Sequence, residues 1–206
     1  MIKAKHHVVI YPLFKGLSRF LLKRTFNSLQ LEGILTDVGG SVLLIANHIS
    51  WLDGFWVEYL NQRVFKRVFH FMMLEEQLKK HWYFRFTGGY SVKIKSRDVL
   101  KSLAYTIQLL SHRSNMVLMF PQGKIHSGHT AIVHFEKGIQ AVVDGCPDTT
   151  QVVFLANFTD YFSDPKPNLC MYAQQCSASE LKHKSIEEAY NRHYTSALNA
   201  HQKRTS

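Results

Sequence analysis

The chain has 206 residues, of which 46% are hydrophobic and 13% aromatic. That apolar content suffices for one well-packed core and hardly for two, so we expect a single domain over residues 1–206. There are 25 Lys and Arg against 15 Asp and Glu, a formal charge of +10, which indicates an anionic partner such as nucleic acid or a lipid surface. Three cysteines without a C-x-x-C pair argue against a disulfide framework and a zinc site, and fit a reducing compartment.

The N-terminal segment is amphipathic. Between residues 8 and 26, apolar side chains recur at helical spacings of three and four. Most basic residues fall on the other side, namely Lys15, Arg19, Lys23 and Arg24. The pattern predicts a helix over 8–26 that either packs on its own domain or contacts an anionic membrane surface. The aromatic run 81–86 favours the membrane, because such rings suit the headgroup level. No apolar run approaches the roughly eighteen residues that span a bilayer, so we expect a peripheral protein.

Beyond this helix, short apolar runs alternate with helical patterns. We expect strands at 41–46, 68–72, 90–94, 116–120 and 151–156. Helices are predicted at 53–62, 74–81, 96–111 and 135–143, and a polar C-terminal helix at 179–201. The alternation is typical of an α/β fold with a mixed central sheet flanked by helices. Ligands of open α/β sheets bind beyond the carboxyl ends of strands, so the segment after the first of these strands is a favoured place for a reactive group.

That strand is followed by Asn47-His48-Ile49-Ser50-Trp51-Leu52-Asp53. Residues five apart diverge around a helix that turns about 100° per residue, so His48 and Asp53 pair only if the intervening residues form a turn. Asn47, Ser50 and Asp53 are good turn and cap residues. A carboxylate bonded to one imidazole nitrogen fixes the tautomer and leaves the other nitrogen to take a proton from a hydroxyl. From spacing alone, the alternative is that Asp53 caps a helix and His48 is structural.

The motif Asn-His-x-Ser-x-x-Asp at 47–53 resembles that of the glycerolipid acyltransferase family, in particular its lysophosphatidic acid acyltransferases. Three further blocks follow in the family's order. Residues 88–95 resemble a Gly-rich segment that ends in an acidic residue and an arginine, 120–127 the Phe-Pro-Glu-Gly-Thr-Arg-Ser element, and 135–138 the Phe-x-x-Gly segment. Four ordered blocks over residues 40–160 are far more specific than any one of them.

The resemblance implies an O-acyltransferase that moves a fatty acyl group from acyl-CoA or acyl carrier protein to a hydroxyl of a lysophospholipid or related lipid. His48 would be the general base and Asp53 its partner, with direct attack on the thioester and no cofactor or metal. The setting would be phospholipid biosynthesis at the cytoplasmic face of the membrane. We expect no nucleic-acid partner, because only the charge supports one and no zinc-finger or RNP-like block is present.

The acceptor-binding part departs from the family pattern. Gln122, Ile125 and Ile94 stand where the family has an acidic residue and two arginines. Isoleucine offers no bidentate fork for a phosphate, whereas nearby lysines bind phosphate as point charges. The candidate acceptor site therefore comprises Lys93, Lys95, Gln122, Gly123 and Lys124. Alternatively, the acceptor lacks that phosphate, as an aminolipid or a glycolipid does, and an amine acceptor would give an amide.

Two other interpretations remain. The histidines at 126, 129 and 134 do not match the His-Glu-x-x-His pattern, so no metal site is expected there. The charge of +10 also fits a non-enzymatic module that binds membranes or nucleic acid.

Overall fold

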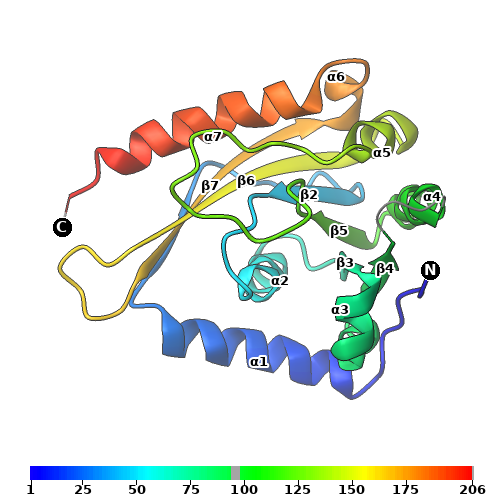
Figure 1. The fold of residues 1–206 in the computed structure, drawn as a ribbon, viewed down its shortest axis with the longest axis horizontal. Helices are drawn as coiled ribbons and strands as arrows, with labels where there is room; N and C mark the ends of the chain where they lie inside the picture. Colours follow the sequence, from blue (N-terminus) through cyan, green and yellow to red (C-terminus); the bar gives the residue numbers. More distant parts are fainter. Residues whose placement is uncertain (94–97, 206) are drawn as a thin grey trace.

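A seven-stranded sheet forms the middle layer of the computed structural model, which describes residues 1–93 and 98–205 (Figure 1). In spatial order the strands are β1 (Leu29–Glu32), β7 (Asn168–Ser177), β6 (Gln151–Asp160), β2 (Val42–Ala46), β5 (Asn115–Met119), β3 (Val68–Leu74) and β4 (Gly89–Val92). The central strand β2 is parallel to its neighbours β5 and β6. β7 is antiparallel to β6, so the sheet is mixed, as predicted.

Helices cover both faces of the sheet (Figure 1). One face carries α1 (Ile10–Thr25), α2 (Asp53–Arg63), α3 (Glu75–Lys80) and the short 3-10 helix η1 (Trp82–Phe86). The other carries α4 (Asp98–Leu110), α5 (Ile139–Gly145), α6 (Ala178–Leu181) and α7 (Ile186–Gln202). The predicted α/β architecture is therefore confirmed.

β2 is buried on both faces. Leu43 and Ile45 join the apolar core under α4, α5 and α7, whereas Val42, Leu44 and Ala46 join the core under α1 and α2. A parallel strand covered on both sides needs apolar side chains at every position, which explains its uninterrupted apolar run. The carboxyl end of β2 therefore emerges between two helical layers, and the reactive segment follows there.

The C-terminal region corrects the prediction most. The single helix expected at 179–201 is wrong, because α6 and α7 are separate helices. Ser177 and Ser185 each accept a hydrogen bond from the N–H three residues later, so the polar segment contains two N-caps, and His183 between them has φ of +61°. β1 and β7 were not predicted. β1 is short and partly exposed, and the later half of β7 mixes polar and half-buried residues.

Smaller corrections concern element ends. The helix expected at 135–143 begins only at Ile139, after Gly138 with φ of +121°. The predicted end of one strand at Ile94 and the predicted N-cap Ser96 lie outside the described residues.

α1 confirms the predicted N-terminal helix but buries only part of its apolar surface. Phe14, Ser18 and Leu22 are buried, whereas Leu13 and Phe20 are exposed. Among the described residues, no helix has the length and apolar character needed to cross a bilayer.

Candidate active site

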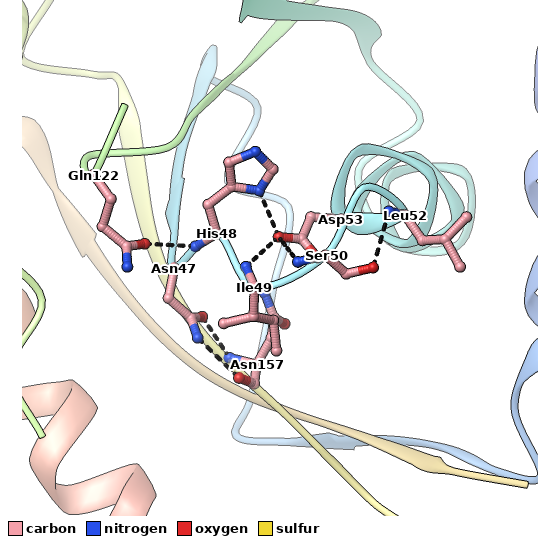
Figure 2. A network of polar contacts seen from close by, with 8 residues as sticks. All are labelled: Asn47, His48, Ile49, Ser50, Leu52, Asp53, Gln122 and Asn157. Atoms are coloured by element: carbon pink, nitrogen blue, oxygen red, sulfur yellow. Dashed lines mark hydrogen bonds and ion pairs between the residues drawn. The ribbon is translucent and has the colours of Figure 1, made fainter. Parts of the chain in front are cut away.

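Residues 47–53 form the turn between β2 and α2. His48 Nδ1 lies 2.7 Å from Asp53 Oδ2 (Figure 2). The same oxygen accepts hydrogen bonds from the backbone N–H of Ile49 at 2.7 Å and of Ser50 at 3.1 Å. The predicted turn and the contact between the two side chains are thus present. Asp53 accepts from N–H groups that precede α2, so its side chain does not cap that helix.

Burial separates the two side chains of the pair. Asp53 is fully buried, whereas 20% of the His48 side chain is exposed. Burial raises the pKa of Asp53, and the hydrogen bond and charge of His48 oppose that rise. When Nδ1–H donates a hydrogen bond to the carboxylate, Nε2 carries no proton and is the acceptor nitrogen of the ring. Figure 2 shows this nitrogen on the side of the ring away from Asp53, where it can receive a proton.

The loop after β5 holds His48 in place. The imidazole stacks on the Phe120 ring with centroids 4.1 Å apart and planes 11° from parallel. Gln122 Oε1 accepts a hydrogen bond from the His48 backbone N–H at 2.6 Å (Figure 2), and the His48 carbonyl accepts one from His126 N–H at 2.8 Å. The loop thus fixes the ring and both backbone groups of His48.

An apolar cavity of about 500 Å³ lies beside His48. Its size falls in the range of roughly 300–1,000 Å³ that is usual for small-molecule sites. Apolar side chains from both helical layers and the sheet line it, among them Phe14, Phe55, Phe71, Phe84, Leu103 and Met119. Polar side chains lie along it as well, namely Gln77, His81, Lys124, Glu136 and Lys137. Such a cavity accommodates an apolar chain whose reactive end lies at the imidazole.

The five candidate acceptor residues have different surroundings. Gly123 and Lys124 line the cavity, and Lys124 is exposed. Gln122 is buried, and its oxygen holds the backbone of His48 instead of facing an acceptor. Lys93 is exposed and directly follows a cavity-lining residue of β4. Lys95 lies outside the described residues.

Two further residues shape the acceptor side. Ile125 is half exposed and lines the cavity, so an apolar side chain occupies the place where the resemblance leads us to expect an arginine. Glu136 lies against Gly123, whose φ is +67°; a Cβ added there would be 3.2 Å from Glu136 Cγ. Neither Glu136 nor the ring of Phe120 was recognised as a site residue, although both stand inside the sequence blocks described above.

Across residues 1–93 and 98–205, no group of three or more His, Cys, Asp or Glu side chains is arranged to hold a metal ion. His134 Nδ1 lies 3.5 Å from Oε1 of Glu187, a residue of α7.

Comparisons with known proteins identify the family of the chain and a structure of similar fold. The family model described as Acyltransferase matches residues 24–154, more than half of the chain. Among solved structures, the chain is similar to the 1-acyl-sn-glycerophosphate (LPA) acyltransferase PlsC from Thermotoga maritima. The TM-score is 0.64 and the identity 18%, over 95% of this chain and 81% of PlsC, so the likeness establishes a shared fold. None of the curated proteins compared with the chain matches it. The family match favours an enzyme over a non-enzymatic basic module, and this chain belongs to the acyltransferase family.

Proposed function

We propose that the protein transfers a fatty acyl group from an acyl-CoA or acyl carrier protein thioester to a hydroxyl of a lysophospholipid or a related lipid. The observation that carries this proposal is the His48–Asp53 pair beside an apolar cavity of about 500 Å³. An imidazole with a buried carboxylate partner supplies a base, and the cavity suits an acyl chain. A lysophospholipid acceptor is supported by PlsC, a protein of similar fold that is a 1-acyl-sn-glycerophosphate (LPA) acyltransferase.

The reaction needs one proton transfer in each direction. His48 Nε2 takes the proton of the acceptor hydroxyl while the oxygen attacks the thioester carbonyl carbon. Asp53 stabilises the imidazolium that forms. When the tetrahedral intermediate collapses, the C–S bond breaks and the imidazolium returns the proton to the departing thiolate. The products are an ester and a free thiol.

The chain's thiols are poor candidates for an acyl-enzyme. Cys146 and Cys170 are buried, and burial raises the pKa of both thiols. Burial also raises the pKa of Cys176 to about 11. A thiol reacts as its thiolate, and a raised pKa removes the thiolate at neutral pH. Direct attack by the acceptor is therefore the simpler route.

The proposal is tested by thiol release. Purified protein is incubated with lipid extract and either acyl-CoA or acyl carrier protein carrying a fatty acid, and free thiol is measured. We expect His48→Ala to abolish release while circular dichroism and the Tm remain those of the wild type. His129→Ala, which removes an exposed histidine of the neighbouring loop, serves as the matched control. Unchanged turnover in His48→Ala would exclude His48 as the base.

A second acceptor class is favoured by Ile125, the apolar side chain that lines the cavity where arginine is expected. An acceptor without a phosphate beside its reacting group, such as an aminolipid or a glycolipid, fits that substitution. Mass spectrometry of products from competing acceptors distinguishes the classes and separates an ester from an amide. If the phosphate-free class is correct, Ile125→Arg shifts the preference toward lysophosphatidic acid. Faster turnover of lysophosphatidic acid by the unmodified protein would exclude that class as the main substrate.

The exposed side of α1 supports a further part of the proposal, contact with an anionic membrane at the cytoplasmic face. Leu13, Leu17 and Phe20 are 66%, 45% and 59% exposed, and they lie one to two turns apart on one side of the helix. Arg19 and Lys23 are exposed beside them. An apolar stripe next to cations is typical of helices that lie in a lipid interface. Phe14 of the same helix lines the cavity, so this contact would bring the cavity to the lipid.

Vesicle sedimentation tests the membrane contact. We expect binding to vesicles that contain phosphatidylglycerol, with weaker binding to neutral phosphatidylcholine. The triple variant Leu13→Ser, Leu17→Ser, Phe20→Ser should lose it. Leu100→Ser changes an equally exposed leucine of α4, on the other face of the sheet, and should bind like the wild type. Equal binding by both variants would contradict a role for α1.

A further inference from the structure

Asn47, the residue before His48, is held by Asn157 in the second half of β6. Its Nδ2 donates to the Asn157 carbonyl at 2.9 Å, and its Oδ1 accepts from the Asn157 N–H at 2.7 Å (Figure 2). Both residues are at most 1% exposed. β2 ends at Ala46, so these two bonds extend the attachment of β2 to β6 beyond the strand itself. They fix the backbone at the point where His48 begins.

α7 contacts β6 two residues before Asn157. The Tyr190 hydroxyl donates to the Leu155 carbonyl at 3.0 Å, and Tyr190 is fully buried. Leu155 is the register partner of Ala46, so the hydroxyl acts within one residue of Asn47. Burial raises the pKa of Tyr190, and the nearby backbone N–H of Asn47 opposes that rise. The hydroxyl is therefore uncharged at neutral pH and donates to the strand.

We propose that Tyr190 is a positioning residue for the His48–Asp53 pair, because its hydroxyl bonds β6 at Leu155, two residues before Asn157, to which the Asn47 side chain is bonded. Tyr190 lies on α7, beyond residue 154 where the family match ends. It acts through Asn47 and Asn157 and does not touch the substrate. The inference rests on the proposed function of His48 as the base.

The physical reason is the sensitivity of proton transfer to geometry. A displacement of about 1 Å in a reacting group can cost on the order of 100-fold in rate. The ring of His48 is held by Asp53 and Phe120. The backbone of His48 is held by Gln122 and by the preceding residue, Asn47. Loss of the Tyr190 hydroxyl leaves the Leu155 carbonyl with one donor fewer, which loosens the part of β6 that carries Asn157.

Tyr194 provides a matched control. It stands four residues further along α7, is 1% exposed, and its hydroxyl donates to the Thr130 carbonyl at 2.9 Å. Tyr190→Phe and Tyr194→Phe each remove one buried hydroxyl and keep the ring. We expect Tyr190→Phe to lower kcat about ten-fold with KM for the thioester within about two-fold, because the cavity is untouched. Tyr194→Phe should lose a similar amount of Tm and keep its kcat. Equal kcat in the two variants would overturn the proposal.

Nuclear magnetic resonance separates this proposal from the proposed function. With ¹⁵N-labelled histidine, the His48 signals are identified by their loss in His48→Ala. We expect Tyr190→Phe, and not Tyr194→Phe, to shift the His48 ring resonances and to speed exchange of the Nδ1 proton with water. This result would support the positioning role even if no lipid were acylated. Unchanged His48 signals in Tyr190→Phe would refute it even if the wild type were a fully active acyltransferase.

Discussion

Asp53→Asn tests the pair with the smallest possible change. An asparagine oxygen can still accept the N–H groups of Ile49 and Ser50, which lie 2.7 Å and 3.1 Å from Asp53 Oδ2. These two donors hold the amide with its oxygen toward the turn, and His48 Nδ1 can still donate to that oxygen. The substitution therefore keeps the geometry of the turn and removes the negative charge. The change is therefore mainly the loss of the charge, together with an NH2 group in place of the buried Oδ1, for which the described residues offer no hydrogen-bond partner.

The size of the loss follows from the 2.7 Å separation. Two unit charges at that distance attract by about 6 kcal/mol at an effective dielectric constant of about 20. That energy corresponds to about four powers of ten in rate, which is an upper limit because 20% of the His48 side chain is exposed to water. The neutral hydrogen bond that remains retains part of the stabilisation. We therefore expect kcat to fall by about 10²–10⁴.

Stability should change in the opposite direction. Burial raises the pKa of Asp53 in the folded state. The folded protein therefore loses stability as the pH rises through that pKa and the carboxyl ionises. Asp53→Asn removes that cost, and its Tm at neutral pH should equal or exceed that of the wild type. Asp148→Asn is the control. It makes the same change in a residue that forms an ion pair with Lys182 and whose own side chain is 69% exposed.

The assay is thiol release under saturating thioester, with urea unfolding measured on the same samples. If Asp53→Asn remains within about ten-fold of the wild type in kcat, the charge of Asp53 is not used in the reaction. The reasoning would also be refuted if the loss of rate came with a loss of Tm, because the change would then have disrupted the turn.

Three further predictions concern other parts of the structure. Burial raises the pKa of Glu58 from 4.5 to about 7, so its contribution to stability is present below pH 4.5 and is lost as the pH rises through about 7. Glu58→Gln should remove this pH dependence, worth up to about 3 kcal/mol, and raise the urea midpoint at pH 8. Gly123→Ala should lower the free energy of unfolding by about 1–2 kcal/mol, because Gly123 has a φ of +67°, and it should lower kcat. Gly128→Ala is the control: an added Cβ there meets nothing closer than 3.9 Å, so Tm and kcat should not change. Val99→Phe should fill part of the cavity and shift turnover toward shorter thioesters, measured across a series of chain lengths.

Local patterns in the sequence were sufficient to predict the core and the turn that pairs His48 with Asp53. The apolar run of β2 and the turn-forming residues after it predict a strand that ends in a reactive loop, and the 2.7 Å contact between His48 and Asp53 is found there. β7 could not be predicted in the same way, since its polar and apolar residues do not alternate cleanly. The break between α6 and α7 was missed because Ser185, the N-cap of α7, stands in a polar segment. No regular spacing of apolar residues runs through that segment, so the sequence gives no visible interruption there.

The acceptor side was harder to predict because its contacts join segments far apart in the chain. Gln122 was predicted to belong to the acceptor site, yet its oxygen accepts the N–H of His48, 74 residues earlier. A glutamate oxygen can accept the same N–H, so an exchange of Gln122 for glutamate keeps this hydrogen bond and adds a charge. Gln122→Glu should therefore preserve the fold of the turn, and a preference for a different acceptor should not depend on it. Ile125 and Glu136 line the cavity and contribute an apolar side chain and a carboxyl group to its wall. We therefore expect the identity of the acceptor to depend on these two positions.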